Sequence, residues 1–284
     1  MANAQQTATM VVDGVKLSYA DRGEGRPVVF VHGFAASSES WQAVAQTLSE
    51  SNRVITLDLM GFGRSDKPAN QPYTMERQAS LLRGFLSQLG LRGFVLAGHS
   101  YGGGVCLSLL RRDHGLNLKG LVLVDTVCYP QPLPLGVRVL RLPLLGALAA
   151  RFAATEFVIR QGLKRAYYRP LLINPRLVQS YAEAARSPGG RHALRETARR
   201  LLPPDMDLLL RSYANISLPT LVLWGEKDPL VPVALGRKLS GQIPGAAAQM
   251  RVLRDCGHCP QEEMPDRTAE IIGDFLLRLS PHVA

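Results

Sequence analysis

Cysteine is scarce in this chain of 284 residues, which contains only Cys106, Cys128, Cys256 and Cys259. A disulfide scaffold needs a much higher density, so the fold is expected to depend on a buried apolar core. Cys256 and Cys259 have the spacing of a redox dithiol. A thioredoxin-like site, however, lies early in a small fold, whereas this pair lies near the end of a long chain. We therefore expect no redox function from the pair.

Long apolar runs are also absent. The longest apolar region, residues 133–150, is interrupted by Arg138, Arg141 and Pro143, whereas a membrane-spanning helix needs about 20 apolar residues in succession. The first ten residues have neither the basic start nor the apolar core of a secretory signal. With a hydrophobic fraction of 46%, the sequence predicts a globular cytoplasmic protein without an integral membrane segment.

Acidic residues are outnumbered, since 23 Asp and Glu stand against 33 Lys and Arg and give a net charge of +10. The imbalance is concentrated in residues 128–213, which contain fourteen basic and five acidic residues. Aromatic residues, only 6% of the chain, are not interleaved with these charges as a nucleic-acid stacking platform requires. We expect a solvated basic face and no nucleic-acid partner, and leave attraction of anionic substrates or a membrane surface open.

Short apolar runs alternate with helical patterns along most of the chain. These strand-like segments occupy residues 27–31, 53–57, 94–97, 121–124, 218–224 and 248–253, and the fully apolar runs at 27–31 and 121–124 are typical of strands buried on both faces of a sheet. Alternation over 11–19, with a turn at Asp13-Gly14, indicates an antiparallel hairpin. Helices are expected at 40–48, 75–89, 101–112 and 266–279. This order predicts an α/β fold with a mostly parallel central sheet and helices on both faces.

Residues 128–213 interrupt this alternation. They contain no strand pattern, only helical stretches broken by proline at 144–163, 175–186 and 190–202. An all-helical insertion at this point predicts a cap, or lid, over the carboxyl ends of the strands. We therefore expect a core formed by residues 1–127 and 214–284 and a helical cap formed by residues 128–213. Which cap residues line a pocket is not predictable from such a pattern.

Residues 94–104 carry the strongest chemical signal. Apolar residues lead into Ser100, which has glycine two residues before it and glycines two, three and four residues after it. This spacing is typical of a nucleophile elbow, in which a strand turns so sharply into a helix that larger flanking side chains would collide. The hydroxyl of such a serine stands at the carboxyl end of a sheet. We therefore predict that Ser100 is a nucleophile.

A serine nucleophile needs a base, and the base needs an acid to orient it. In an open α/β sheet both should come from loops that follow strands. Asp228 follows the strand predicted at 218–224 and is the expected acid, while Glu226 and Asp125 stay open as alternatives. His258 follows the strand predicted at 248–253 and is the expected base. Because this histidine must be free for proton transfer, we expect no metal site and no cofactor.

The developing oxyanion needs backbone N–H donors. One is expected from Tyr101, directly after the nucleophile, and the other from Phe34, in the loop after the strand at 27–31. Both roles belong to the backbone, so these two side chains can line a pocket. His32 and His99 are expected to be structural, hydrogen-bonded within their loops.

Taken together, these motifs resemble the α/β-hydrolase superfamily, in the branch that contains haloalkane dehalogenases, epoxide hydrolases, meta-cleavage-product hydrolases and small carboxylesterases. The similarity extends from about residue 10 to the end of the chain, in the family's order Ser, Asp, His. The matching segments are His32-Gly33-Phe34, 58–65, 98–103, 224–229 and Gly257-His258.

The resemblance also limits the reactions that we expect this protein to catalyse. Dehalogenases and epoxide hydrolases of this branch use an aspartate nucleophile, so Ser100 argues against both activities. We expect a serine carboxylesterase that cleaves esters of small to medium hydrophobic acyl groups through an acyl-enzyme. Two alternatives stay open. One is a carbon–carbon bond hydrolase of meta-cleavage-type diketones, whose substrate carboxylate the basic cap could hold, and the other is a hydrolase-like ligand receptor with little turnover. The sequence does not predict the oligomeric state.

Overall fold

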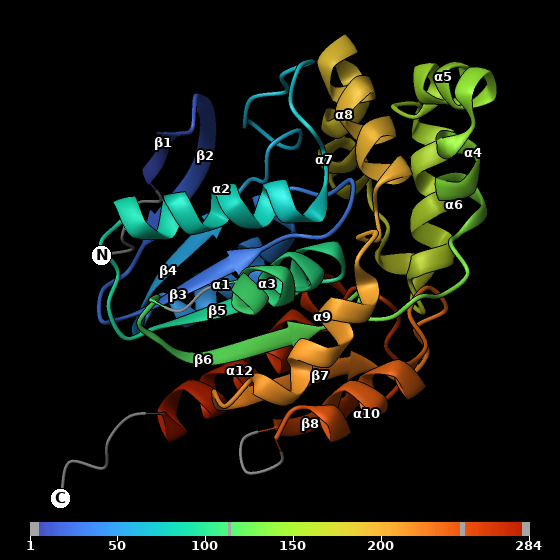
Figure 1. Cartoon of the computed structure of the whole chain (residues 1–284). Coiled ribbons are helices and arrows are strands. Elements are labelled where there is room, and N and C mark those ends of the chain that lie inside the picture. The colour runs from blue at the N-terminus through green and yellow to red at the C-terminus, as the bar shows by residue number, and fades with distance from the viewer. Residues whose placement is uncertain (1–5, 113–114, 245–247, 280–284) are drawn as a thin grey trace, which may run out of the picture.

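A central sheet of eight strands organises the computed structural model, which describes residues 6–112, 115–244 and 248–279 (Figure 1). The strands are Gln6–Val12 (β1), Val15–Arg22 (β2), Arg26–Val31 (β3), Asn52–Leu57 (β4), Phe94–His99 (β5), Leu118–Val124 (β6), Thr220–Gly225 (β7) and Ala248–Leu253 (β8). Their order in the sheet is β1-β2-β4-β3-β5-β6-β7-β8. β2 pairs antiparallel with both β1 and β4, and the remaining neighbours pair parallel. The predicted α/β fold is confirmed.

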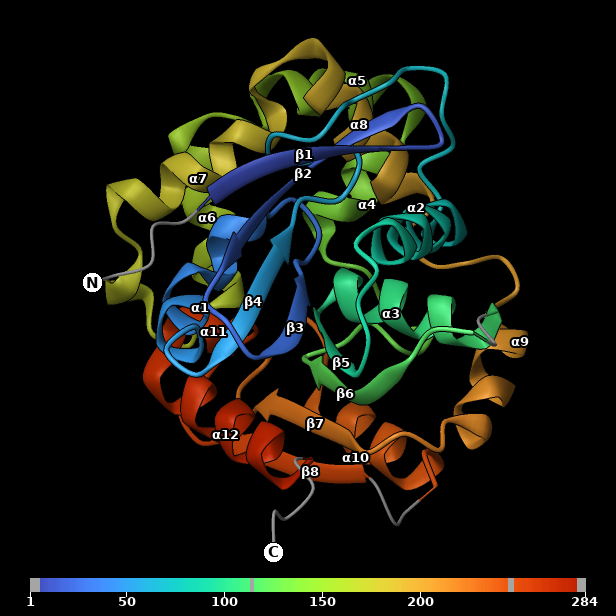
Figure 2. The same cartoon turned by 90° about the vertical axis from the view of Figure 1, so that its left-hand side faces the viewer.

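Helices cover both faces of this sheet (Figure 2). They are α1 (Gln42–Leu48) and α12 (Pro265–Arg278) on one face, and α2 (Met75–Gln88), α3 (Tyr101–Arg112), α9 (Met206–Ser212) and α10 (Val233–Gln242) on the other. Successive strand residues point to opposite faces. Val28 and Phe30 therefore join the apolar core under α1 and α12, whereas Val29 and Val31 join the core under α2 and α3. Because an apolar core lies on each face of the sheet, the strands carry apolar residues at consecutive positions.

The chain between β6 and β7 forms a block of helices beyond the carboxyl ends of the parallel strands (Figure 1). These helices are α4 (Leu135–Arg141), α5 (Pro143–Phe152), α6 (Glu156–Ala166), α7 (Pro175–Arg186) and α8 (Pro188–Arg199). Proline occupies the first turn of α5, α7 and α8, where its missing N–H breaks no intrahelical bond. The prolines that interrupt the pattern in the sequence thus begin helices. The cap boundaries at 128 and 213 stay a prediction, and α9, which lies inside them, packs against α3.

Several short elements lack a clear sequence signal: the 3-10 helices Ser38–Trp41 (η1), Pro170–Leu172 (η2) and Tyr213–Asn215 (η3), and α11 (Pro260–Glu263). α10 was not expected either, because two glycines dilute its helical pattern. A crossover between the parallel strands β7 and β8 requires a connection of this kind. Gly236 of α10 packs so close to Trp224 that an added Cβ would lie 2.5 Å from the ring. Within the described residues, no helix combines the length and apolar character needed to cross a membrane.

Candidate active site

Ser100 lies at the turn from β5 into α3 with a left-handed backbone, φ 51°. Such a conformation costs a residue with a side chain of the order of 1–3 kcal/mol and persists only where its surroundings enforce it. Here the enforcement comes from close packing of glycines, since a Cβ on Gly98 would lie 2.6 Å from Cα of Gly103. The backbone N–H of Ser100 also donates to the carbonyl of Val124 at 2.9 Å. The strand-to-helix turn expected from the glycine spacing is therefore present.

The structure brings Ser100, His258 and Asp228 together, and all three are buried. Nε2 of His258 lies 2.9 Å from Oγ of Ser100, and its Nδ1 lies 2.7 Å from Oδ2 of Asp228. The other carboxylate oxygen of Asp228 accepts the backbone N–H groups of Leu230 and Val231 at 2.7 and 3.0 Å. The three side chains form a hydrogen-bonded chain from Ser100 through His258 to Asp228, which is the geometry that the proposed nucleophile, base and acid require.

The two alternative acids are placed differently. Glu226 forms an exposed ion pair with Lys227, whereas Asp125 is fully buried beside Asp228. Burial raises the pKa of the Asp125 carboxyl well above its usual range, and the neighbouring charge of Asp228 adds to this effect. Burial opposes ionisation of Asp228 as well, but His258 and the hydrogen bond from Asp125 hold the pKa of Asp228 below its ordinary value. Of the two neighbouring carboxyls, that of Asp125 therefore holds a proton more readily than that of Asp228.

Asp125, Asp228 and His258 place three potential metal-ligand atoms within 4.8 Å of one another. Two of these atoms, Nδ1 of His258 and Oδ2 of Asp228, are already hydrogen-bonded to each other. A metal would need a deprotonated histidine nitrogen and two ionised carboxylates, yet burial raises the pKa of Asp125 and opposes its ionisation. The arrangement fits a proton relay better than a cation site.

The loop after β3 lies against the elbow, as the expected oxyanion donors require. A Cβ on Gly33 would lie 3.2 Å from Cβ of Ser100. The next two residues are Phe34, which lines the cavity above Ser100, and Ala35, which is also left-handed with φ 60°. Tyr101 begins α3, so its backbone N–H belongs to the unpaired first turn of a helix. The positions of Phe34 and Tyr101 suit two donors directed at one oxygen.

The histidines beside these donors are held by backbone hydrogen bonds. Nε2 of His32 accepts the N–H of Leu59 at 3.0 Å, and its Nδ1 donates to the carbonyl of Gly33. Nε2 of His99 lies 2.7 Å from the carbonyl of His258, to which it donates. Burial lowers the pKa of His99 to about 3, so the ring stays neutral. Through these hydrogen bonds, both histidines hold the loops of the candidate site in place.

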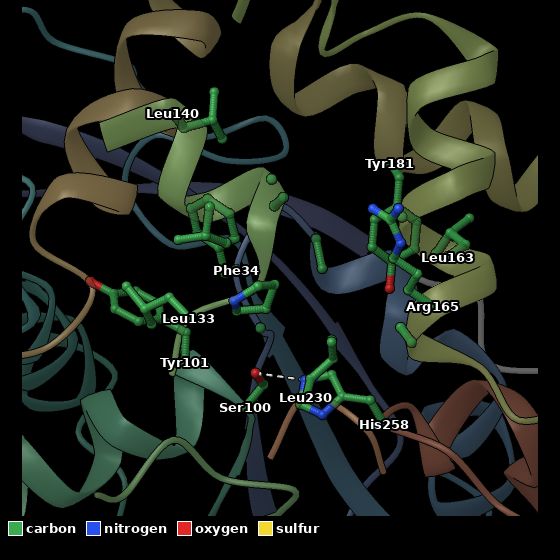
Figure 3. Close-up of a pocket in the computed structure, with 18 of the residues that line it drawn as sticks. Phe34, Ser100, Tyr101, Leu133, Leu140, Leu163, Arg165, Tyr181, Leu230 and His258 are labelled. Carbon is green, nitrogen blue, oxygen red and sulfur yellow. Dashed lines mark hydrogen bonds between the residues drawn. The ribbon is translucent and has the colours of Figure 1, made fainter. Parts of the chain in front are cut away.

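A cavity of about 1230 Å³ extends from Ser100 toward α4, α6 and α7. Its lining is mainly apolar, and Arg165 is its one side chain with a permanent charge among the described residues. Figure 3 shows two opposing walls above Ser100 and His258, formed on one side by Phe34, Tyr101, Leu133 and Leu140 and on the other by Leu163, Arg165 and Tyr181. The helices between β6 and β7 thus supply most of the surface that a substrate would meet.

Sequence reasoning missed two carboxylates that tie these helices to the loop of His258. Glu263 accepts the N–H of Gly257 with one oxygen, and the N–H groups of Tyr168 and Arg169 with the other. Glu262 accepts the hydroxyls of Tyr167 and Tyr181 at 2.9 and 2.8 Å. The only available signal was two acids four and five residues after the candidate base. Apart from Gly257, their partners lie about 80 to 95 residues away in the chain, beyond the reach of any local pattern.

Cys256 and Cys259 flank His258, and both are buried free thiols. Burial raises the pKa of each thiol, with the carboxylates of Glu262 and Glu263 adding to the effect at Cys259. A redox dithiol needs a lowered thiol pKa. The pair therefore serves as packing around the histidine loop.

Glu262 should make stability depend on pH. Burial raises the pKa of its carboxyl to about 7, above the ordinary 4.5, so the folded protein keeps a proton that the unfolded chain releases. This contribution to stability, on the order of 3 kcal/mol, is fully present below pH 4.5 and is lost as the pH rises through 7.

Thermal melting between about pH 4 and 8 should therefore show a steeper decline for the wild type than for Glu262→Gln. Glu270→Gln, on the exposed side of α12, is the matched control and should follow the wild type. Parallel curves for all three proteins would refute this role.

Comparisons with known proteins agree with this geometry. The family model described as alpha/beta hydrolase fold matches residues 26–265. An uncharacterized hydrolase of Bacillus subtilis is 28% identical over 93% of this chain and 96% of its own length. A 2-hydroxymuconate semialdehyde hydrolase of Pseudomonas putida is 29% identical over 93% of this chain and 91% of its own length. A thermophilic esterase from Thermogutta terrifontis superposes with a TM-score of 0.78 at 28% identity, covering 98% of this chain and 99% of that one.

The family match spans most of the chain and includes the elbow, the loop after β3 and the loops that carry Asp228 and His258. It coincides with a mostly parallel sheet of eight strands and with helices on both faces. The chain therefore belongs to the alpha/beta hydrolase fold family and is a hydrolase of that fold.

Proposed function

We propose that this protein is a serine hydrolase that cleaves carboxylic esters of small to medium hydrophobic acyl groups. The observation that carries the proposal is the chain of hydrogen bonds from Ser100 through His258 to Asp228 at the base of an apolar cavity. A serine in this position acts on an electrophilic carbonyl carbon. An apolar cavity of this volume accommodates an acyl chain better than a charged group.

In the proposed reaction, Oγ of Ser100 attacks the ester carbonyl while Nε2 of His258 takes the hydroxyl proton. The backbone N–H groups of Phe34 and Tyr101 bind the resulting oxyanion, and Asp228 stabilises the imidazolium. The protonated His258 then gives its proton to the leaving alcohol as the carbon–oxygen bond breaks, which leaves an acyl-enzyme. A water molecule deprotonated by His258 attacks this ester, and the acid is released as the proton returns to Ser100.

We further propose that residues 128–213 act as a cap that determines the shape of the substrate-binding cavity. Most of the cavity wall away from Ser100 comes from this segment, including Leu133, Leu140 and Leu163. Two contacts tie it to the catalytic loop: Glu263 to Tyr168 and Arg169, and the N–H of His258 to the carbonyl of Ala166 at 2.8 Å. Because these contacts lie next to the proposed base, closure of the cap and alignment of His258 should be coupled.

A second candidate, hydrolysis of a carbon–carbon bond in a meta-cleavage-type diketone, is favoured by Arg165. Such a substrate carries a carboxylate, and Arg165 is the lining cation that could hold it. The similarity to the Pseudomonas putida hydrolase supports the same reading. Figure 3 places Arg165 on the wall opposite Leu133, so a substrate held by Arg165 would have to extend from that wall to Ser100.

A panel of nitrophenyl esters from acetate to dodecanoate tests the main proposal. Each methylene buried in an apolar cavity contributes about 0.8 kcal/mol, so kcat/KM should rise about tenfold or more from acetate to hexanoate before the cavity is filled. An acyl group that ends in a carboxylate should react more slowly than its neutral equivalent. Faster cleavage of the anionic ester, or no turnover of any ester, would contradict the proposal, and in the second case a receptor role would gain support.

The panel separates the two candidates when it is repeated with Arg165→Met. This variant should hydrolyse hexanoate at the wild-type rate, whereas a carbon–carbon hydrolase would lose about tenfold or more on its carboxylate-bearing diketone. Lys164→Met, on the same helix but outside the cavity lining, is the matched control. Cleavage of the diketone with a higher kcat/KM than any ester, together with sensitivity to Arg165→Met, would favour the second candidate.

A further inference from the structure

The outer surface of helices α4 to α6 exposes an unusual number of large apolar side chains. Of the fourteen exposed large apolar residues in the described chain, eight lie within residues 135–158. Single exposed leucines are common on soluble proteins, but a cluster of this size on neighbouring helices marks an interaction surface. We define the apolar face by its six main members, which are Leu135, Leu144, Leu145, Leu148, Phe152 and Phe157.

The spacing on α5 explains how this face forms. Leu144, Leu148 and Phe152 recur every four residues and lie on one side of the helix, with exposed fractions of 85%, 54% and 56%. Gly146 and Ala150, on the opposite side, are buried against the neighbouring helices. α5 is therefore apolar on both sides, although the protein covers only one of them. An uncovered apolar side suggests a partner outside the chain.

The charged residues of α4 and α5, the helices that carry five of the six members of the apolar face, are all arginines. Arg138, Arg141 and Arg151 are exposed on α4 and α5, and residues 128–155 contain no acidic residue. The first acid after them, Glu156, pairs with Arg160 at 2.8 Å. Apolar side chains bordered by unopposed arginines match a surface that is apolar inside and anionic at its rim.

We propose that the apolar face docks onto an anionic lipid surface, with its leucine and phenylalanine side chains at the boundary between headgroups and acyl chains and its arginines on the lipid phosphates. A second copy of this chain is a poorer occupant, because pairing two such faces would bring their arginines together without acids between them. The proposal concerns peripheral docking, which needs no membrane-spanning helix.

The cavity and the apolar face share the same helices. Leu135 and Phe157 are exposed, at 62% and 71%, and also line the cavity that leads to Ser100. An amphiphile leaving a bilayer on this side would therefore meet the cavity mouth directly. This consequence for substrate delivery rests on the proposed function, whereas the docking itself does not.

Sedimentation with vesicles tests the docking. The full-length protein should bind vesicles of equal parts phosphatidylglycerol and phosphatidylcholine about tenfold or more tightly than vesicles of phosphatidylcholine alone, since each basic residue at an anionic surface contributes roughly fivefold. The variant Leu144→Glu/Leu148→Glu/Phe152→Glu should lose this binding. Leu277→Glu, which replaces an equally exposed leucine on α12 (72%), should bind like the wild type.

Several outcomes would overturn the docking. They are failure of the wild type to bind anionic vesicles, unchanged binding by the triple glutamate variant, and a dimer in sedimentation velocity that this variant abolishes. The glutamate positions lie outside the cavity lining, so unchanged hydrolysis of a soluble ester shows that the variant is folded.

A second set, Arg138→Gln/Arg141→Gln/Arg151→Gln, should weaken binding only to the anionic vesicles. Ser100→Ala should bind vesicles like the wild type, so failure of the esterase proposal would be recognised separately.

Discussion

Replacing Ser100 with alanine is expected to lower kcat for nitrophenyl butyrate by about 10⁴- to 10⁶-fold, because no other group can form the acyl-enzyme. The backbone donors of Phe34 and Tyr101 and the cavity would stay intact. A residual acceleration over water, of about 10³-fold, should therefore remain. The wild type should also gain the mass of one phosphonyl group when treated with a fluorophosphonate, and Ser100→Ala should not.

Ser108→Ala is the matched control for this prediction, since Ser108 is also buried and lies on α3, the helix that follows Ser100. It should keep wild-type activity and should still be labelled. A fluorophosphonate adduct on any residue other than Ser100, or hydrolysis by Ser100→Ala at more than about a tenth of the wild-type rate, would remove Ser100 from the proposed role.

Asp228→Asn is expected to lower kcat by about 10³- to 10⁴-fold with little change in the fold. Asp228 accepts Nδ1–H of His258 at 2.7 Å, which leaves Nε2 free to receive the proton of Ser100. An asparagine amide can instead donate to Nδ1, which selects the opposite tautomer of the ring and removes the base. The negative charge that stabilises the imidazolium would be lost as well. Steady-state kinetics with nitrophenyl butyrate measure the effect, and circular dichroism checks the fold.

Asp125→Asn provides the discriminating control, because Asp125 is the alternative acid and lies beside Asp228. Its oxygens accept the N–H of Gly225 at 3.0 and 3.3 Å, and burial together with the charge of Asp228 raises the pKa of its carboxyl. An asparagine side chain can both accept and donate in the same places, so activity should fall by no more than about threefold. A large loss in Asp125→Asn with little loss in Asp228→Asn would transfer the role of the acid to Asp125.

Local patterns were sufficient for much of the fold. Strands buried on both faces must be apolar at every position, and β5 and β7 were readable for this reason. α7 was predicted with its observed bounds because Asn174 and Pro175 form a cap and first turn that are encoded locally. α10 was missed because two glycines weaken its helical pattern, and one of them, Gly236, is needed for the close approach to Trp224, which only the structure shows.

The candidate site likewise combines residues that the sequence indicates with features that only the structure shows. Ser100, Asp228 and His258 were identifiable because each follows a strand, and the carboxyl ends of parallel strands meet at one edge of a sheet. The raised pKa of Asp125 was not identifiable, because it depends on burial and on a carboxylate 103 residues further along the chain. Glu262 and Glu263 were missed for the same reason, since their partners belong to the helices above the sheet.

The sequence by itself determined the class of fold, the alternation of buried strands and helices, and the three residues proposed for the reaction, because these depend on periodicity and on short motifs. Only the tertiary structure decided which acid lies against His258, which helices line the cavity above Ser100, and that Arg165 points into it. It also decided that α5 leaves one apolar side uncovered. These features arise from contacts between distant segments, and a side chain's environment is set by such contacts and not by its neighbours in the chain.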